Sequence, residues 1–245
     1  MRRSAALALL MALLWPAGAQ AWTPHVASAA RWANARRCSV TFAVRTDDHL
    51  WGRGVDAQVP SASVFKAMLL ATYLRRSSVR HRDLTEADRA LLRPMIRRSD
   101  NTAATRVRDI VGNPAVVRLA RKAGMTRFAI ADVWGMSQIT ARDQSKYFLR
   151  IERLLPARHR AYALELLRTI VPPQRWGMAQ VVPAGWTLYF KGGWGSGSGA
   201  VDHQVGLLAR GDERVSIAVL TVGSPSHAYG KATLRGVSKR LLAGL

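Results

Sequence analysis

The sequence predicts an α+β protein in which an antiparallel five-stranded sheet is flanked by helices, as an α/β/α sandwich, next to an all-helical lobe. Three observations lead to this fold class. Two strand patterns lie near the start of the chain and three lie near its end. Short turns separate neighbouring strands, which is typical of antiparallel pairing. The long stretch between the two groups of strands has helical patterns.

The composition indicates a folded domain of ordinary size. The chain has 245 residues, of which 49% are hydrophobic and 21% are charged, enough for one domain with a sizeable core. Cys38 is the single cysteine, so an internal disulfide is excluded, and we interpret it as a small apolar residue at the start of a strand.

The first residues have the pattern of a secretory signal peptide. Basic residues at positions 2 and 3 precede an apolar run from Ala5 to Trp15, and Ala19-Gln20-Ala21 is a small-x-small cleavage site. The run is shorter than the roughly 20 residues of a membrane span, although an uncleaved anchor is the alternative. We therefore expect residues 1–21 to be removed and residues 22–245 to form an exported domain, which would be periplasmic, cell-wall-associated or extracellular.

The charge is strongly positive, with 37 basic and 15 acidic residues and a net charge of +22. The arginines are spread along the chain, and no basic stripe with interleaved aromatic residues is present, so we predict no nucleic-acid partner. An anionic cell envelope, bound loosely through the general field, is the better candidate.

The elements follow from local signals. Thr23-Pro24 can begin a helix because proline suits the first helical turn, and Thr85 can cap another. Asp47-Asp48 and Arg210-Gly211-Asp212 are turns between strands. Strands are expected at 39–45, 49–55, 187–190 running into Lys191, 204–209 and 215–221. Helices are expected at 23–36, 61–75, 85–97, 102–111, 113–123, 140–155, 159–167 and 229–242.

Three further features of the organisation follow from this order. The terminal helices should cover one face of the sheet, and the helical lobe should span about 76–180. Gly124 to Gln138 is the least regular segment. The run from Gly195 to Ala200 lies between two strands, so we interpret it as a turn and not as a dinucleotide-binding loop.

The first candidate motif is Ser63-Val64-Phe65-Lys66 at the start of a predicted helix. Residues i and i+3 share a helix face, so the amine lies beside the hydroxyl. A serine needs a nearby base to become a nucleophile, and a lysine can act as that base only if the site suppresses its charge.

The second motif, Ser99-Asp100-Asn101, lies between two predicted helices. A second serine can relay a proton, and an asparagine amide can both donate to and accept from a substrate amide. Chance gives roughly 0.01 copies of this tripeptide in such a chain. A helix cap is the alternative role, and both roles can hold together.

The third motif is Lys191-Gly192-Gly193, where a predicted strand ends. A lysine there can face a substrate carboxylate, and the glycines allow a substrate backbone to lie along the strand.

These motifs, in this order, resemble those of the class A β-lactamases and penicillin-binding proteins. The resemblance extends to Pro183–Trp186, to the residues that follow Ser99, and to Val219–Gly223 before the last helix. It implies a β-lactamase-like fold and a serine hydrolase that forms an acyl-enzyme on a β-lactam ring or on a related cyclic or D-Ala-type amide.

The resemblance also implies a role for each matching residue. Ser63 would form the acyl-enzyme and Lys66 would be the general base or proton relay. Ser99, with Lys191 nearby, would pass a proton to the leaving nitrogen. Asn101, Gly193 and Trp194 would bind substrate, and the backbone N–H groups of Ser63 and Trp194 would form the oxyanion hole, where Trp194 matters only through its backbone. We expect neither cofactor nor metal, because the six histidines are isolated.

Two departures from the family pattern concern the substrate. Gly192 stands where the family has Thr or Ser, whose hydroxyl helps to bind a carboxylate, although Ser196 or Ser198 could supply one. The loop after Ser-Asp-Asn lacks the Glu that activates the deacylating water, and Asp132 is the one carboxylate from Gly124 to Thr140. Asp132 is therefore either a substitute acid/base or a solvated loop residue.

Three hypotheses remain open at this point. The first is a β-lactamase-type hydrolase acting on a small β-lactam. The second is a slow-deacylating penicillin-binding D,D-peptidase or esterase acting on a peptidoglycan-derived peptide. The third is a non-catalytic binding module on the same fold. A monomer is expected in each case.

Overall fold

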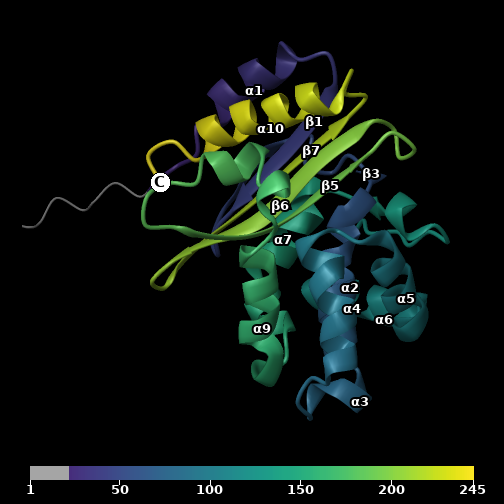
Figure 1. Cartoon of the computed structure of the whole chain (residues 1–245). Coiled ribbons are helices and arrows are strands. Elements are labelled where there is room, and N and C mark those ends of the chain that lie inside the picture. Colours follow the sequence, from purple (N-terminus) through teal and green to yellow (C-terminus); the bar gives the residue numbers. More distant parts are fainter. Residues whose placement is uncertain (1–21) are drawn as a thin grey trace, which may run out of the picture.

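The computed structural model describes residues 22–245 (Figure 1). The predicted signal peptide, residues 1–21, lies outside the described residues. Within 22–245, none of the helices combines the length and the apolar character that crossing a membrane requires. The strands are β1 Ser39–Arg45, β2 Leu50–Arg53, β3 Val59–Pro60, β4 Gln138–Ile139, β5 Thr187–Gly195, β6 Val201–Arg210 and β7 Glu213–Val222.

The helices, including short 3₁₀ turns (η), match most of the predicted segments. They are α1 Val26–Asn34, η1 Ala62–Val64, α2 Phe65–Leu74, α3 Ser77–Arg80, α4 Glu86–Arg97, α5 Asn101–Val111, α6 Asn113–Ala123, η2 Trp134–Met136, α7 Ala141–Leu149, α8 Ile151–Leu154, α9 Ala157–Arg168, η3 Pro172–Gln174, η4 Gly177–Gln180 and α10 His227–Leu241.

The main sheet has five antiparallel strands in the order β2-β1-β7-β6-β5, so the predicted fold class is confirmed. The first long strand of the chain pairs with the last, with Phe42 opposite Val219. This pairing joins residues from the two ends of the chain. In the resulting strand order β5, which carries Lys191, lies at an edge of the sheet.

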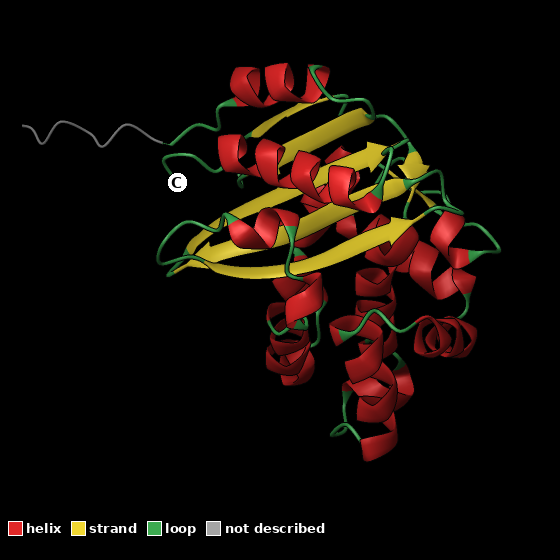
Figure 2. Ribbon diagram, turned by 45° about the horizontal axis from the view of Figure 1, so that its top comes forward, coloured by secondary structure: helices red, strands yellow, loops and turns green. Residues whose placement is uncertain are grey.

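Helices cover both faces of the sheet (Figures 1 and 2). The terminal helices α1 and α10 pack against each other over one face, as predicted. The helix α7 packs on β1, β6 and β7 at the other face, and the helices from α2 to α9 extend from that side. The helix α2 is buried along its whole length, which indicates that it is the central helix of this layer.

Several predicted boundaries of strands and helices were wrong. β5 continues to Gly195 and β6 begins at Val201, since the two strands pair through glycines that resemble turn residues in the sequence. The predicted helix 140–155 is divided at Arg150 into α7 and α8. The small sheet of β3 and β4 was not predicted, because two-residue strands carry no periodicity.

Candidate active site

Ser63 lies in the 3₁₀ turn η1 that leads into α2, and its residue is almost fully buried. The turn is held by its neighbours. The backbone N–H of Ser61 donates to Ser137 O at 2.8 Å, and His203 Nε2 on β6 donates to Pro60 O at 2.9 Å. Ala62 has a positive φ of 42°, a strained conformation of the kind that persists where packing overdetermines it.

His203 is neutral in this arrangement. Its Nδ1 accepts from the backbone N–H of Thr221 at 3.1 Å, so Nε2 carries the proton. Burial lowers the pKa of His203 to about 4. This histidine therefore fixes the backbone ahead of Ser63 and takes no part in a Ser-His-Asp triad.

The Lys66 amine lies one helical turn after Ser63 and is fully buried. Its Nζ donates to the backbone oxygen of Ser99, to Ser99 Oγ at 3.1 Å and to Asn101 Oδ1 at 2.7 Å. The Trp134 ring covers the amine, with its centroid 5.1 Å from Nζ. Among the described residues no carboxylate forms an ion pair with this lysine, so its charge has no direct partner.

Ser99 and Asn101 reach Lys66 because the residue between them caps a helix. Asp100 Oδ1 accepts from the backbone N–H of Ala103 at 2.7 Å at the start of α5. Ser99 takes a positive φ of 59° at the junction of α4 and α5. A non-glycine residue in this region is strained, and such strain clusters at functional sites. The capping and site roles of this motif therefore coexist.

Lys191 brings the third motif to the same point. It is fully buried on β5, and its Nζ donates to Ser99 Oγ at 3.0 Å and to Gly192 O at 2.8 Å. The Ser99 hydroxyl thus lies between two lysine amines that are 125 positions apart in the chain.

Burial suppresses the charge on both lysines. It lowers the pKa of Lys66 to about 7, against a smaller opposing effect of Asp100. Burial also lowers the pKa of Lys191 well below its ordinary value, and repulsion from Lys66 adds to this shift. Near neutral pH a neutral amine is therefore available at Lys66, as a general base requires.

Gly193 lies directly against the backbone at Ser63. A Cβ at this position would come within 2.9 Å of the Ser63 nitrogen and 3.1 Å of Ser61 O. Only a glycine allows β5 to approach η1 so closely. The strand segment that carries Trp194 consequently runs beside the Ser63 N–H group.

A cavity of about 630 Å³ opens at this point. It brings together Ser63, Asn101 and Trp194, while Lys66, Ser99 and Lys191 do not line it. The lining residues are Ala62, Ser63, Asn101, Val133, Trp134, Gly135, Met136, Trp194, Gly195, Gly197 and Ser198, and none is acidic.

Comparison with known proteins identifies the family. The model of the beta-lactamase enzyme family matches residues 88–245, which include Ser99 and Lys191 but not Ser63. The chain belongs to the beta-lactamase family. No curated protein sequence matches the chain.

Solved structures of the same fold are distant in sequence. A beta-lactamase from Sphaerobacter thermophilus has a TM-score of 0.73 at 20% identity, with 87% of this chain and 95% of that chain covered. PBP-A has a TM-score of 0.73 at 18% sequence identity, with 88% of this chain and 93% of PBP-A covered. An ancestral class A beta-lactamase has a TM-score of 0.74 at 17% sequence identity, with 90% of this chain and 100% of that chain covered. A PBP-A variant has been solved as an acyl-enzyme complex with penicillin G. At these identities the likeness establishes the fold.

Not every predicted site residue of this beta-lactamase family member reaches the site. Asp132 is exposed, makes no hydrogen bond among the described residues and does not line the cavity, although Val133 beside it does. Gly192 lies against the Trp176 ring, 3.5 Å from where its Cβ would be. Ser198 lines the cavity, and its hydroxyl donates to Gly195 O at 3.4 Å, whereas Ser196 is exposed.

Sequence reasoning missed two features of the site. The contacts of Trp134, which lines the cavity, stacks on Phe65 and covers the Lys66 amine, were not predicted. The contact of the Trp194 side chain with His227, on which it stacks beside the cavity, was also not predicted. No local pattern could have indicated either contact, since each joins segments that are far apart in the chain.

Proposed function

We propose that this beta-lactamase family member is a serine hydrolase that forms an acyl-enzyme at Ser63. The observation that carries the proposal is the Ser99 hydroxyl between the amines of Lys66 and Lys191, at 3.1 and 3.0 Å. In the free amine form, Lys66 takes the proton of the Ser63 hydroxyl as that oxygen attacks the substrate carbonyl. Ser99 passes its proton to the leaving nitrogen and regains one from the protonated Lys66, with the Lys191 amine beside the same hydroxyl, so protons balance over the step.

Binding groups surround the same point. Asn101 holds the amide of the substrate side chain, and Gly193 leaves space along β5. The backbone N–H groups of Ser63 and Trp194 stabilise the oxyanion, the contribution that is usually largest in acyl transfer. The substrate class is a β-lactam or a related cyclic or D-Ala-type amide, and residues 1–21 direct export to the cell envelope.

A slow-deacylating penicillin-binding enzyme is the second candidate. It is favoured by the absence of an acidic residue from the lining of the Ser63 cavity and by the exposed position of Asp132. Without a positioned base, hydrolysis of the acyl-enzyme loses about 10²- to 10⁴-fold. The PBP-A acyl-enzyme with penicillin G offers a precedent on this fold.

Labelling with penicillin tests both candidates. Wild-type protein should take up one labelled penicillin per chain, detected by mass spectrometry of the intact protein, and Ser63→Ala should abolish the adduct. Ser77→Ala, an exposed serine on α3, is the matched control and should label as wild type does. Rapid release of the label indicates a β-lactamase, whereas a persistent adduct indicates the second candidate. Labelling that survives Ser63→Ala would falsify the assignment, and absence of any label favours a non-catalytic binding module.

A further inference from the structure

A second cavity, of about 340 Å³, adjoins the cavity at Ser63. The two share Trp194 and Gly195 at the end of β5, immediately after the glycine that contacts the nucleophile backbone. The second cavity is lined by Trp194, Gly195, Ser196, Ala200, Val201, Asp202, Ser224, Pro225, Ser226 and His227. A substrate acylated at Ser63 can therefore extend into it past Trp194.

A histidine–aspartate pair lies in this second cavity. His227 Nδ1 and Asp202 Oδ1 are 2.5 Å apart. The Asp202 side chain is 3% exposed and the His227 side chain 41% exposed, so the imidazole is the member that a ligand meets. The other ring nitrogen of His227, Nε2, forms no hydrogen bond among the described residues.

The helix that carries His227 is adapted to the buried carboxylate. A Cβ at Gly230, inside α10, would overlap the carboxylate of Asp202. Glycine is unfavourable within a helix, so its presence here is explained by the space that Asp202 needs. The pair is thus fixed from both sides, by β6 and by α10.

Apart from the buried Asp202 carboxyl, the charges around this cavity favour an anion. Its lining includes the residues that lead into the N-terminus of α10, where the helix dipole is positive and the first turn has no acidic residue. The charged or titratable groups that act on Asp202 are His227 and Lys231, both basic. Burial raises the pKa of Asp202. A carboxylate bound at Nε2 selects the form of the ring in which this nitrogen carries a proton and donates to it.

Neither lysine of the site is placed to bind a substrate carboxylate. Lys66 and Lys191 line neither cavity, and burial lowers the pKa of both amines. Gly192 has no hydroxyl to contribute. His227 is therefore the one basic side chain of the described residues that lines either cavity.

We propose that His227, positioned by Asp202, binds a carboxylate of the substrate that acylates Ser63. This inference rests on the proposed function for the identity of the substrate. The Trp194 ring, stacked on His227 at 5.8 Å, forms the wall along which the substrate passes from one cavity to the other. Asp202 acts through His227 and is a positioning residue.

The test compares penicillin G with its uncharged methyl ester, in binding and in acylation. Binding is measured by calorimetry on Ser63→Ala, which cannot form the adduct. That protein should bind the carboxylate form more tightly, and adding His227→Gln should reduce this preference about ten- to hundredfold, the usual effect of losing a charge-assisted hydrogen bond. His227→Arg should restore the preference for the carboxylate form, and Asp202→Asn should weaken this preference. His81→Gln, an exposed histidine after α3, should leave it unchanged.

The outcomes separate the two proposals. Wild-type labelling together with a preference that His227→Gln does not alter overturns the subsite and leaves the proposed function standing. A preference that depends on His227 without any labelling of wild type overturns the function and leaves the subsite standing. Equal loss of affinity for both compounds in His227→Gln indicates a purely structural role and also overturns the subsite.

Discussion

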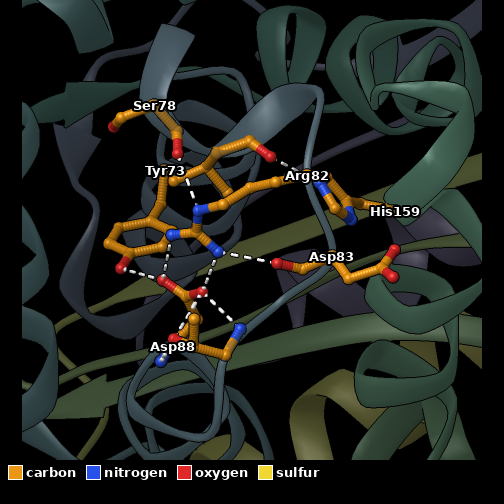
Figure 3. A network of polar contacts seen from close by, with 8 residues as sticks. Tyr73, Ser78, Arg82, Asp83, Asp88 and His159 are labelled. Carbon is orange, nitrogen blue, oxygen red and sulfur yellow. Dashed lines mark hydrogen bonds and ion pairs between the residues drawn. The ribbon is translucent and has the colours of Figure 1, made fainter.

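The two ends of α2 carry buried polar networks of opposite kinds. At the N-terminal end, the Lys66 amine is surrounded by neutral hydrogen-bonding groups of Ser99 and Asn101. At the C-terminal end, Tyr73 contacts a buried carboxylate, Asp88, that is paired with Arg82 (Figure 3). Lys66 and Asp88 are both buried beside the same helix, and the contrast shows the effect of a counter-charge.

The C-terminal network satisfies its charge completely. Asp88 accepts from Tyr73 Oη at 2.6 Å, from Arg82 Nη1 at 2.6 Å and from the backbone N–H of Thr85 at 2.7 Å. These donors outweigh burial and hold the pKa of Asp88 well below its ordinary range. Burial and the carboxylate raise the pKa of Tyr73 to about 12. Asp88 also closes the capping box of α4, so the network joins two helices.

The comparison teaches that pairing, and not burial alone, separates a structural network from a reactive one. Asp88 keeps its charge at every physiological pH and anchors the helical side of the molecule. Lys66 lacks a carboxylate partner and loses its charge near neutral pH. Strained or unpaired buried groups are costly, and proteins retain them mainly at functional sites.

Removing the lysine should give the largest effect on chemistry. Lys66→Met should slow penicillin labelling by about 10²- to 10⁴-fold, the usual contribution of a general base. The free energy of unfolding should stay the same or rise, because an unpaired buried amine is replaced by an apolar side chain of similar length. Adduct formation by mass spectrometry and urea unfolding measure the two quantities. Labelling within tenfold of wild type would contradict a base role for Lys66.

Removing the carboxylate at the other end should give the opposite result. Asp88→Asn should lower the free energy of unfolding by about 1–2 kcal/mol, since hydrogen bonds to a charged acceptor are weakened while the half-exposed Arg82 stays solvated. The labelling rate of the folded protein should not change. Because the folded pKa of Asp88 lies below its ordinary 3.8, the network stabilises the wild type above about pH 4, and this contribution is lost as the pH falls. Urea unfolding at pH 7 and at pH 3 should show a smaller difference between wild type and variant at pH 3.

Giving the N-terminal end a carboxylate should make it resemble the other end. The wild-type labelling rate should rise with pH to a plateau, with a midpoint near 7, as Lys66 loses its proton. Trp134→Glu places an acid where the ring now covers the amine, and it should move this midpoint up by about one unit. Trp134→Gln controls for the lost ring and should keep the midpoint near 7. An unchanged midpoint in the Glu variant would show that the amine does not govern the rate.

Much of the fold was predictable because its signals are local. The α4 cap at Thr85, the turn at Asp47-Asp48 and the alternation in Ser39–Arg45 each specify an element within a few residues. The length of β5 was not predictable in this way. Its glycines favour a turn locally, and only pairing with β6 makes them strand residues.

The candidate site likewise has features that local sequence signals predicted and features that only tertiary packing decided. The sequence by itself determined the three motifs, the spacing of Ser63 and Lys66 at the start of a helix, and the absence of the usual loop Glu. Only the tertiary structure decided that Asp132 lies outside the cavity, that Trp134 covers the amine, and that Asp202 and His227 meet beside Trp194. The physical reason is that charge and burial depend on every segment packed around a group, whereas sequence signals act over a few neighbouring residues.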